Sequence, residues 1–336
     1  VATPRTPKIS SELLNQVMCG QAIMLADGGM GSLIQQAGLS QIHDVPDLLN
    51  LTHASDICTL QREYVEAGSD CLATNTFSSN RLKLANHDAS VDELYAAAAQ
   101  IARDAGAPLV AGDIGPTGSL LAPLGELGFE EAYDIFAEQA RAACAAGCDL
   151  IFLETFADLL EARAALLACL DNTPLPVFVT MTFGEDGRTF MGTTPAVAAA
   201  TLSALGASAV GINCSLGPKE ILPFAQRLCR SVPAGVPVFV KPNAGLPQES
   251  DGKAVYATLP EEFASDMADY IRQGVRVAGG CCGTTPVYIR KIVDASRTLS
   301  PVPLTDKQIT CVSSYTHAVK FDKQPLLIGE RINPTG

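Results

Sequence analysis

The chain alternates between short apolar runs and longer segments in which apolar residues recur every three to four positions. The short runs are rich in apolar and β-branched residues and are bounded by Gly, Pro or Asp, which predicts buried strands. Eight such runs occupy residues 23–27, 71–76, 108–113, 150–155, 176–182, 209–214, 237–243 and 276–281.

The longer segments predict helices at 55–67, 92–105, 129–146, 158–170, 195–205, 218–230, 260–272 and 286–297. Several begin at Pro, whose missing N–H has no cost in the first helical turn. Several end at a glycine such as Gly68 or Gly147, which supplies a left-handed cap. Strict alternation of eight strands and eight helices predicts an α/β fold, a (β/α)8 TIM barrel over residues 15–300. A doubly wound open sheet is the alternative, and its usual strand number fits less well.

Both ends of the chain fall outside this repeat. Residues 1–14 form an N-terminal extension, and residues 301–325 contain Pro, Ser and Thr without periodicity, which predicts a linker. The run at 326–336 predicts the first strand of a further domain that the chain only begins.

Charge and composition exclude some functions. The net charge of -13 disfavours a nucleic-acid partner, because phosphate binding needs clustered Lys and Arg. Residues 189–218 carry no charge, but Pro195 and many Gly, Ser and Thr favour a buried helix–strand pair over a membrane span. No signal-peptide pattern opens the chain, and the 11 cysteines show no paired framework. We expect free thiols in a cytoplasmic protein.

The candidate chemistry lies where strands end, because a barrel keeps its active site at the C-terminal ends of its strands. Cys214 ends the sixth predicted strand, and Cys281 and Cys282 follow the eighth. Glycines at 279, 280 and 283 allow the sharp bend that two adjacent ligands need. Three converging thiols predict a Zn²⁺ site, and three protein ligands leave the fourth position open, as catalytic sites do.

Two other interpretations of these cysteines stay open. The spacing lacks the paired C-x2-4-C motifs of structural zinc sites, so buried unreactive thiols are one alternative. A redox role of the adjacent pair is another, although neighbouring cysteines close a strained ring. A zinc site of this kind would hold a substrate thiol as its thiolate, which suits alkyl transfer to sulfur.

Acidic residues end two further strands. Asp27 and Glu154 are candidates to bind the ammonium group of an amino-acid substrate. Either carboxylate could instead cap the next helix or pair with an Arg. The backbone at Gly28 and Gly29 leads into a helix whose N–H groups are candidates for the substrate carboxylate. The dinucleotide fingerprint G-x-G-x-x-G is absent here.

Six motifs in order resemble the homocysteine S-methyltransferase family over residues 15–297. They are DGGMG at 27–31, NTFSSNRLKL at 75–84, LETF at 153–156, GINC at 211–214, KPNAG at 241–245 and GGCCGTTP at 279–286. The segment IGERINPTG at 328–336 resembles the opening of a methyltetrahydrofolate-binding domain, a pterin-binding domain truncated here.

The resemblance implies Zn²⁺ on the three cysteines, with Asn243 as the fourth ligand until homocysteine displaces it. It implies that Asp27 and Glu154 hold the amino group of homocysteine, and that backbone near Gly28 and Gly29 holds its carboxylate. The methyl donor would be methylcobalamin on another domain, recharged by methyltetrahydrofolate.

A stand-alone methyltransferase using betaine, S-methylmethionine or S-adenosylmethionine is the alternative enzyme. The IGERINPTG segment argues against it and favours an enzyme that uses methylcobalamin. A non-enzymatic binding module with a structural zinc is a third hypothesis.

Overall fold

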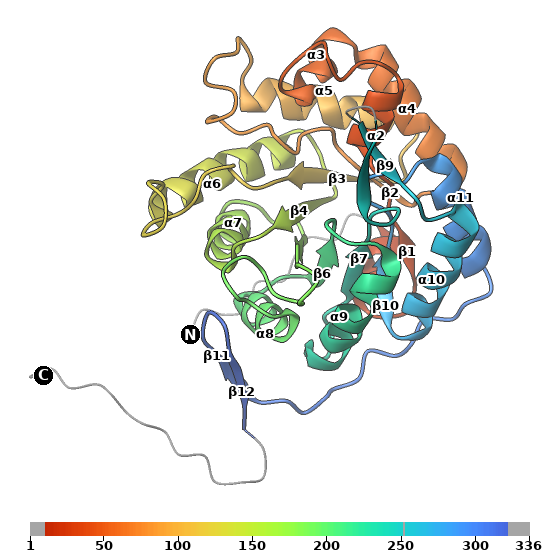
Figure 1. The fold of residues 1–336 in the computed structure, drawn as a ribbon. Helices are drawn as coiled ribbons and strands as arrows, with labels where there is room; N and C mark the ends of the chain where they lie inside the picture. The colour runs from red at the N-terminus through yellow and green to blue at the C-terminus, as the bar shows by residue number, and fades with distance from the viewer. Residues whose placement is uncertain (1–10, 251–252, 322–336) are drawn as a thin grey trace, which may run out of the picture.

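The computed structural model describes residues 11–250 and 253–321, and a ring of eight parallel strands lies at its centre (Figure 1). The strands are β1 (Met24–Leu25), β2 (Cys71–Ala73), β3 (Leu109–Ile114), β4 (Leu150–Phe156), β5 (Val177–Met181), β6 (Ala209–Asn213), β7 (Val238–Lys241) and β10 (Val275–Ala278). Their order is β1-β10-β7-β6-β5-β4-β3-β2. A parallel bridge between Ala26 and Cys71 joins β1 to β2 and closes the ring.

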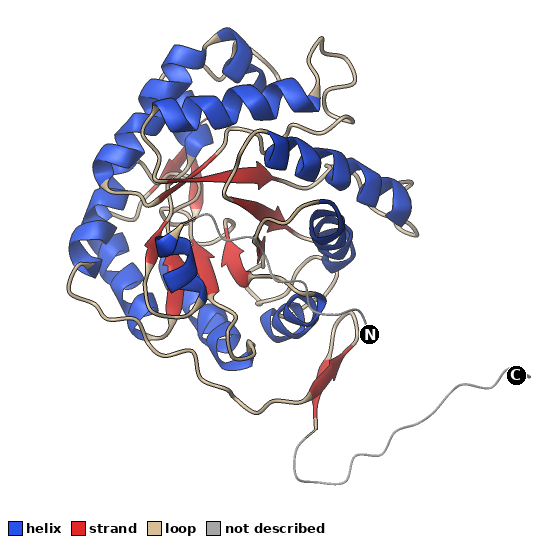
Figure 2. Cartoon of the chain, turned by 180° about the vertical axis from the view of Figure 1, so that it is seen from behind, coloured by secondary structure: helices blue, strands red, loops and turns tan. Residues whose placement is uncertain are grey.

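Eight helices cover the outside of the ring (Figure 2). They are α4 (Ala54–Ala67), α5 (Val91–Asp104), α6 (Phe129–Ala145), α7 (Leu159–Asn172), α8 (Pro195–Leu205), α9 (Pro218–Ser231), α10 (Pro260–Arg272) and α11 (Pro286–Ser296). Shorter helices α2 (Met30–Gln36), η1 (Pro46–Leu48) and α3 (Leu49–Thr52) lie between β1 and α4. The predicted (β/α)8 barrel is confirmed, and the open-sheet alternative is excluded.

Inward-facing side chains divide the barrel into an apolar end and a polar end. In β3 and β4 the inner core holds Leu109 and Ala111, and Leu150 and Phe152. Because side chains alternate along a strand, the next inward positions are Asp113 on β3 and Glu154 on β4. The carboxyl ends of the strands therefore carry polar groups into the mouth of the barrel.

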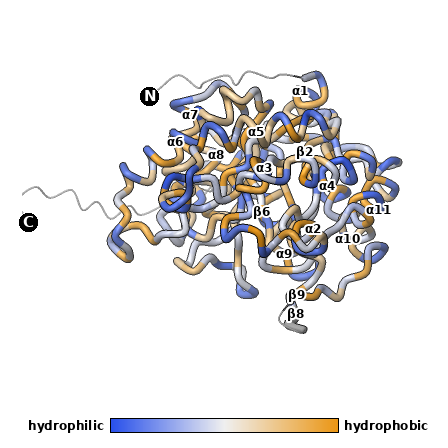
Figure 3. The backbone as a smooth tube through the Cα atoms, turned by 90° about the horizontal axis from the view of Figure 1, so that it is seen from above, coloured by the Kyte–Doolittle hydropathy of each residue, from blue (hydrophilic) through white to orange (hydrophobic). Residues whose placement is uncertain are grey.

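Helix α1 (Glu12–Met18) closes the apolar end, where Leu14 and Val17 pack into the inner core. The hairpin of β8 (Pro247–Ser250) and β9 (Lys253–Tyr256) projects at the opposite end (Figure 3). One end of the barrel is thus filled by hydrophobic side chains, and the other is free to form a binding site.

Two hairpins were not predicted. One is β8–β9, in the connection between β7 and α10. The other, β11 (Cys311–Ser313) with β12 (Ala318–Lys320), lies inside the segment predicted as a linker. It contacts α8, where the hydroxyl groups of Thr201 and Ser313 are 2.9 Å apart.

The predicted strand at 326–336 and most of the extension at 1–14 lie outside the described residues. Within the part of the chain that the structure describes, no helix combines the length and apolar character needed to cross a bilayer.

Candidate metal centre and substrate pocket

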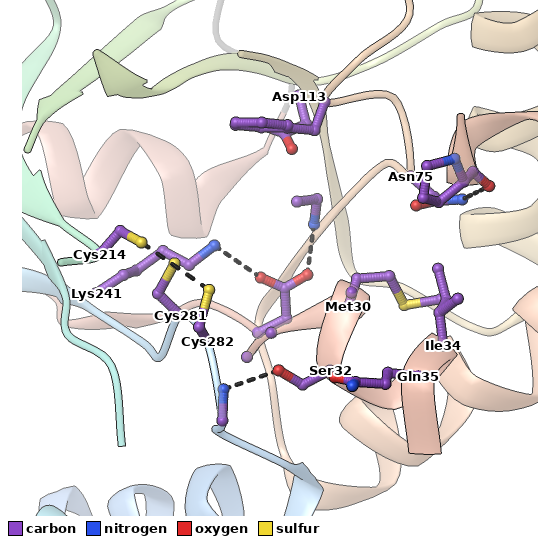
Figure 4. A pocket seen from close by; sticks show the side chains of 18 of the residues that line it. Met30, Ser32, Ile34, Gln35, Asn75, Asp113, Cys214, Lys241, Cys281 and Cys282 are labelled. Carbon is purple, nitrogen blue, oxygen red and sulfur yellow. Dashed lines mark hydrogen bonds and ion pairs between the residues drawn. The ribbon is translucent and has the colours of Figure 1, made fainter. Parts of the chain in front are cut away.

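A cavity of about 830 Å³ opens at the carboxyl ends of the strands. Its wall includes Asp27 after β1, Asp113 on β3, Glu154 on β4, Lys241 on β7 and the loop after β10. Asp27, Glu154 and the three cysteines predicted at strand ends thus meet in one place, and Figure 4 shows the cysteines beside this cavity.

The three predicted cysteines come together at one side of the cavity. Cys214 follows β6, and Cys281 and Cys282 follow β10, which is separated from β6 only by β7. Their Sγ atoms all lie within 4.8 Å of one another, and those of Cys214 and Cys282 are 3.9 Å apart. All three thiols are free, so the adjacent pair forms no disulfide.

The backbone at Cys214 is strained. Cys214 and Ser215 have φ angles of 61° and 64°, in the left-handed region that favours glycine. A residue in this conformation destabilises the folded state by on the order of 1–3 kcal/mol, and it persists only where contacts with the surrounding structure hold it. The N–H of Cys214 donates to the carbonyl of Lys241 at 3.0 Å, which ties the turn to β7. In this turn the sulfur of Cys214 lies within 4.8 Å of the other two.

The loop after β10 is shaped by close packing around its glycines. A Cβ at Gly280 would lie 2.2 Å from Oγ1 of Thr284, and one at Gly283 would lie 2.3 Å from the ring of Tyr256. Gly283 also has a φ of 80°. The glycines of GGCCG are therefore needed for two reasons: a larger side chain would not fit beside the loop, and the bend requires a positive φ at Gly283.

Asn213 links the cysteine cluster to three strands. Its side chain is fully buried and its Oδ1 accepts hydrogen bonds from the N–H of Thr155 and the hydroxyl of Thr180, both at 2.8 Å. Its Nδ2 donates to Oγ1 of Thr155 at 2.7 Å and lies 3.8 Å from the sulfur of Cys281. This amide positions a sulfur of the cluster, a role that was not predicted from the sequence.

Asn243 lies under the same loop. Its Oδ1 accepts the backbone N–H of Cys282 at 3.1 Å, and only 3% of the residue is exposed. In this arrangement the amide holds the turn that carries two of the cysteines. Its role as a fourth metal ligand stays a prediction.

Lys241 bridges the two predicted carboxylates. Its Nζ lies 3.3 Å from Oδ1 of Asp27 and 3.1 Å from Oε2 of Glu154. Burial acts to lower the pKa of Lys241, but the carboxylates of Glu154 and Asp27 outweigh it and raise that pKa, so the side chain stays an ammonium. The sequence predicted that an Arg or a substrate ammonium would pair with these carboxylates. In the structure Lys241 of β7 pairs with both of them.

Asp27 is held by a second contact. Its Oδ2 accepts the backbone N–H of Ala73 at 2.8 Å, which joins the ends of β1 and β2. Burial raises the pKa of Asp27, while Lys241 and the N–H of Ala73 oppose that rise. The carboxylate therefore fastens Lys241 and the first two strand ends together.

Gly28 and Gly29 pack tightly against the loop after β10. A Cβ at Gly28 would lie 2.6 Å from the carbonyl oxygen of Thr284, and one at Gly29 would lie 2.5 Å from that of Cys281. The N–H of Gly29 already donates to the carbonyl of Thr284 at 3.0 Å. These glycines let the first and last loops of the barrel meet, and their carboxylate-binding role stays a prediction.

The three thiols influence one another's ionisation. Hydrogen bonds from Cys214 and Cys281 lower the pKa of the Cys282 thiol well below its ordinary value of 9.0. Contacts with Cys214 and Cys282, together with burial, raise the pKa of Cys281. These contacts favour ionisation at Cys282, and the thiolate is the form in which a cysteine binds a metal.

The fold and this cluster define a (β/α)8 barrel with three convergent thiols at the carboxyl ends of its strands. The chain belongs to the homocysteine S-methyltransferase family, whose model matches residues 24–296. It is 34% identical over 342 residues to the methionine synthase of Mycobacterium tuberculosis and 33% identical over 344 residues to that of Mycobacterium leprae. Each match covers 94% of this chain and 28% of the relative, so the chain spans about 28% of their length.

Solved structures share the fold. The oxidized form of the homocysteine methyltransferase MmuM from Escherichia coli superimposes with a TM-score of 0.71 at 21% identity, over 84% of this chain and 99% of that one. The metallated form of the same protein gives a TM-score of 0.67 at 22% identity. These likenesses establish the barrel architecture independently of the strand count.

Proposed function

We propose that this chain binds Zn²⁺ on Cys214, Cys281 and Cys282 and activates homocysteine for methylation at sulfur, which yields methionine. The observation that carries the proposal is the meeting of three free Sγ atoms within 4.8 Å at the edge of the cavity. Membership of the homocysteine S-methyltransferase family supports the substrate.

The sulfur positions fit the proposed ion. Tetrahedral zinc with Zn–S bonds of about 2.3 Å separates its sulfur ligands by about 3.8 Å. The sulfurs of Cys214 and Cys282 are 3.9 Å apart, and the third lies within 4.8 Å of both. Among the described residues the group consists of these three cysteines, which leaves a fourth position for an incoming thiol on the cavity side.

The bound metal would supply a Lewis acid that keeps the substrate thiol ionised at neutral pH. The chain's own residues do the rest. Asn213 orients the sulfur of Cys281, and Asn243 holds the turn at Cys282. Asp27 and Glu154 provide negative charge for the amino group of homocysteine, and the backbone near Gly28 and Gly29 faces its carboxylate.

We propose methylcobalamin as the methyl donor, carried by another domain of a longer enzyme and recharged on a methyltetrahydrofolate-binding domain. The sequence similarity to methionine synthases supports this assignment, because this chain spans only 28% of their length. All 11 cysteines are free, which fits a reducing compartment such as the cytoplasm.

The test is a donor comparison with the zinc-loaded chain and homocysteine. Methylcobalamin is expected to lose its methyl group, followed by its change in visible absorbance, with methionine formed in equal amount. Betaine, S-methylmethionine and S-adenosylmethionine are offered in parallel. Methionine from one of these and none from methylcobalamin would favour the stand-alone methyltransferase. No methionine from any donor, with chelation abolishing the fold, would favour a structural zinc.

A further inference from the structure

The loop that carries Cys281 and Cys282 has all its backbone donors in use, because each N–H of residues 279–284 makes a hydrogen bond. Four of these N–H groups donate to backbone carbonyls, those of Asp27, Val240, Pro242 and Cys281. The other two belong to Cys282 and Gly283, and a side chain accepts each of them. The turn at Cys282 is therefore the part of the loop whose position depends on side-chain acceptors.

Ser32 supplies one of these two acceptors. It lies in the first turn of α2, and its Oγ accepts the N–H of Gly283 at 2.8 Å. Figure 4 draws this bond next to Cys282, with Ser32 on the wall of the cavity. Because the two partners are 251 positions apart in the chain, the bond joins the first helix after β1 to the last loop of the barrel.

The peptide group between Cys282 and Gly283 is held at both of its ends. A peptide group is planar, so the carbonyl of Cys282 and the N–H of Gly283 move together. The carbonyl accepts the N–H of Ala244 at 3.0 Å, and the N–H donates to Ser32. On the preceding peptide, Asn243 accepts the N–H of Cys282 at 3.1 Å. Ser32 is thus the contact from α2 that opposes the contacts from the loop after β7.

The sulfur of Cys282 needs a precise position if it binds a metal. Its distance of 3.9 Å from the sulfur of Cys214 is close to the separation that tetrahedral zinc imposes. Metal–ligand distances in such sites are defined to within about 0.2 Å. Without an acceptor for the N–H of Gly283, the peptide group after Cys282 would be free to rotate, and the backbone from which this sulfur extends would shift.

We infer that Ser32 is a positioning residue for the metal centre, because its hydroxyl holds the peptide group that follows Cys282. The inference rests on the proposed function, which gives that sulfur a metal to bind. It adds a link between the two ends of the barrel sequence. The N–H of Ser32 donates to the carbonyl of Gly29 at 3.1 Å, so the loop after β1 and the metal loop are fastened to each other through one side chain.

The test is the zinc affinity of Ser32 variants, measured by competition with a chromophoric chelator. Ser32→Ala removes the acceptor and is expected to weaken zinc binding by about tenfold, the lower end of the range for groups behind metal ligands. Ser32→Thr keeps the hydroxyl and should bind zinc as the wild-type chain does. Ser32→Val has the shape of the Thr variant without its hydroxyl, and should show the same loss as Ser32→Ala. Ser55→Ala, on an exposed position of α4, is the control and should change nothing.

Co²⁺ in place of zinc gives a second measurement, because its visible absorption bands report the geometry around the ion. We expect these bands to change in Ser32→Ala and Ser32→Val, and to keep their wild-type positions in Ser32→Thr. A purely structural hydrogen bond would lower the urea midpoint and leave both the bands and the zinc affinity unchanged.

That outcome in Ser32→Ala would overturn the inference, and so would equal zinc affinities in the Thr and Val variants. If Ser32→Ala does not fold, as judged by circular dichroism, the comparison of Thr with Val decides alone. In each of these cases the wild-type chain still binds zinc and the proposed function survives. A wild-type chain that binds neither zinc nor Co²⁺ would defeat the proposed function and the inference together.

Discussion

Cys214 is the single residue on which the thiol cluster most depends, because it alone comes from β6 and its backbone is held in a strained conformation. Cys281 and Cys282 share one loop and could stay near each other without it. Convergence of sulfurs from two strands makes the site a property of the closed barrel.

Replacing this residue tests the metal site directly. We predict that Cys214→Ser weakens zinc binding by more than about 100-fold, since even groups behind the ligands contribute about 10–100-fold. Zinc per chain after dialysis is the measurement. Cys169→Ala, a fully buried thiol in α7, serves as the matched control and should keep its zinc. Full zinc occupancy in Cys214→Ser would remove this cysteine from the site.

Position along a strand allowed the site cysteines to be predicted, since the carboxyl ends of barrel strands meet at one edge. Asp27 and Glu154 lie in the pocket for the same reason. The ion pair of Lys241 was not predicted, although a lysine two residues after the buried Phe239 alternates onto the inner face. The alternation of side chains along β7 could therefore have predicted that Lys241 faces the carboxylates. The hydrogen bonds of Asn213 depend on a bulge in β4 that no sequence periodicity reveals.

At the scale of elements, the loops after β1 and β2 are joined through a buried carboxylate. Asp47 in η1 accepts the N–H of Ser78 at 2.7 Å and the hydroxyl of Ser79 at 2.8 Å. Burial raises the pKa of Asp47 from its ordinary value of 3.8 to about 6, against the pull of those hydrogen bonds. The folded state therefore holds this proton more tightly than the unfolded chain does.

That pKa has a consequence for stability with a definite sign. Between about pH 4 and pH 6 the folded chain keeps the proton that the unfolded chain loses, so rising pH lowers the free energy of unfolding. We predict that this fall is smaller in Asp47→Asn by up to about 3 kcal/mol. Urea denaturation of both chains at pH 4, 5, 6 and 7 is the measurement, with Asp134→Asn, on the exposed face of α6, as the control. If the free energy of unfolding changed with pH equally in both chains, Asp47 would have the same pKa in the folded and unfolded states.

The eight strands and eight helices were predictable because each repeats a strong local pattern with Pro and Gly at its limits. The two hairpins were not, because strands of three or four residues are too short to establish an alternation. The β11–β12 hairpin is held instead by contacts with α8 that are distant in sequence, including the bond from Thr193 to the carbonyl of Tyr315.

Over the whole molecule, the hydrophobic core is complete without a metal. Leu14 and Val17 fill the closed end of the barrel, and the larger core lies between the strands and the helices. Neither cluster includes the three site cysteines. The apolar core therefore lies apart from the thiols, and we expect the barrel to fold without a bound metal.

Metal removal should consequently leave the barrel intact. We predict that chelation of zinc leaves the far-ultraviolet circular dichroism unchanged and the thermal transition cooperative, with a lower Tm that free zinc restores by mass action. Chelation that unfolds the chain at 25 °C would instead indicate a structural zinc, as in domains whose folding depends on metal binding.

The most direct test of the account is zinc K-edge X-ray absorption of the loaded chain with and without homocysteine. We predict three sulfur neighbours at about 2.3 Å in the free chain and four once homocysteine is added. An unchanged sulfur count on saturation with homocysteine, or fewer than three sulfurs in the free chain, would contradict the proposed site.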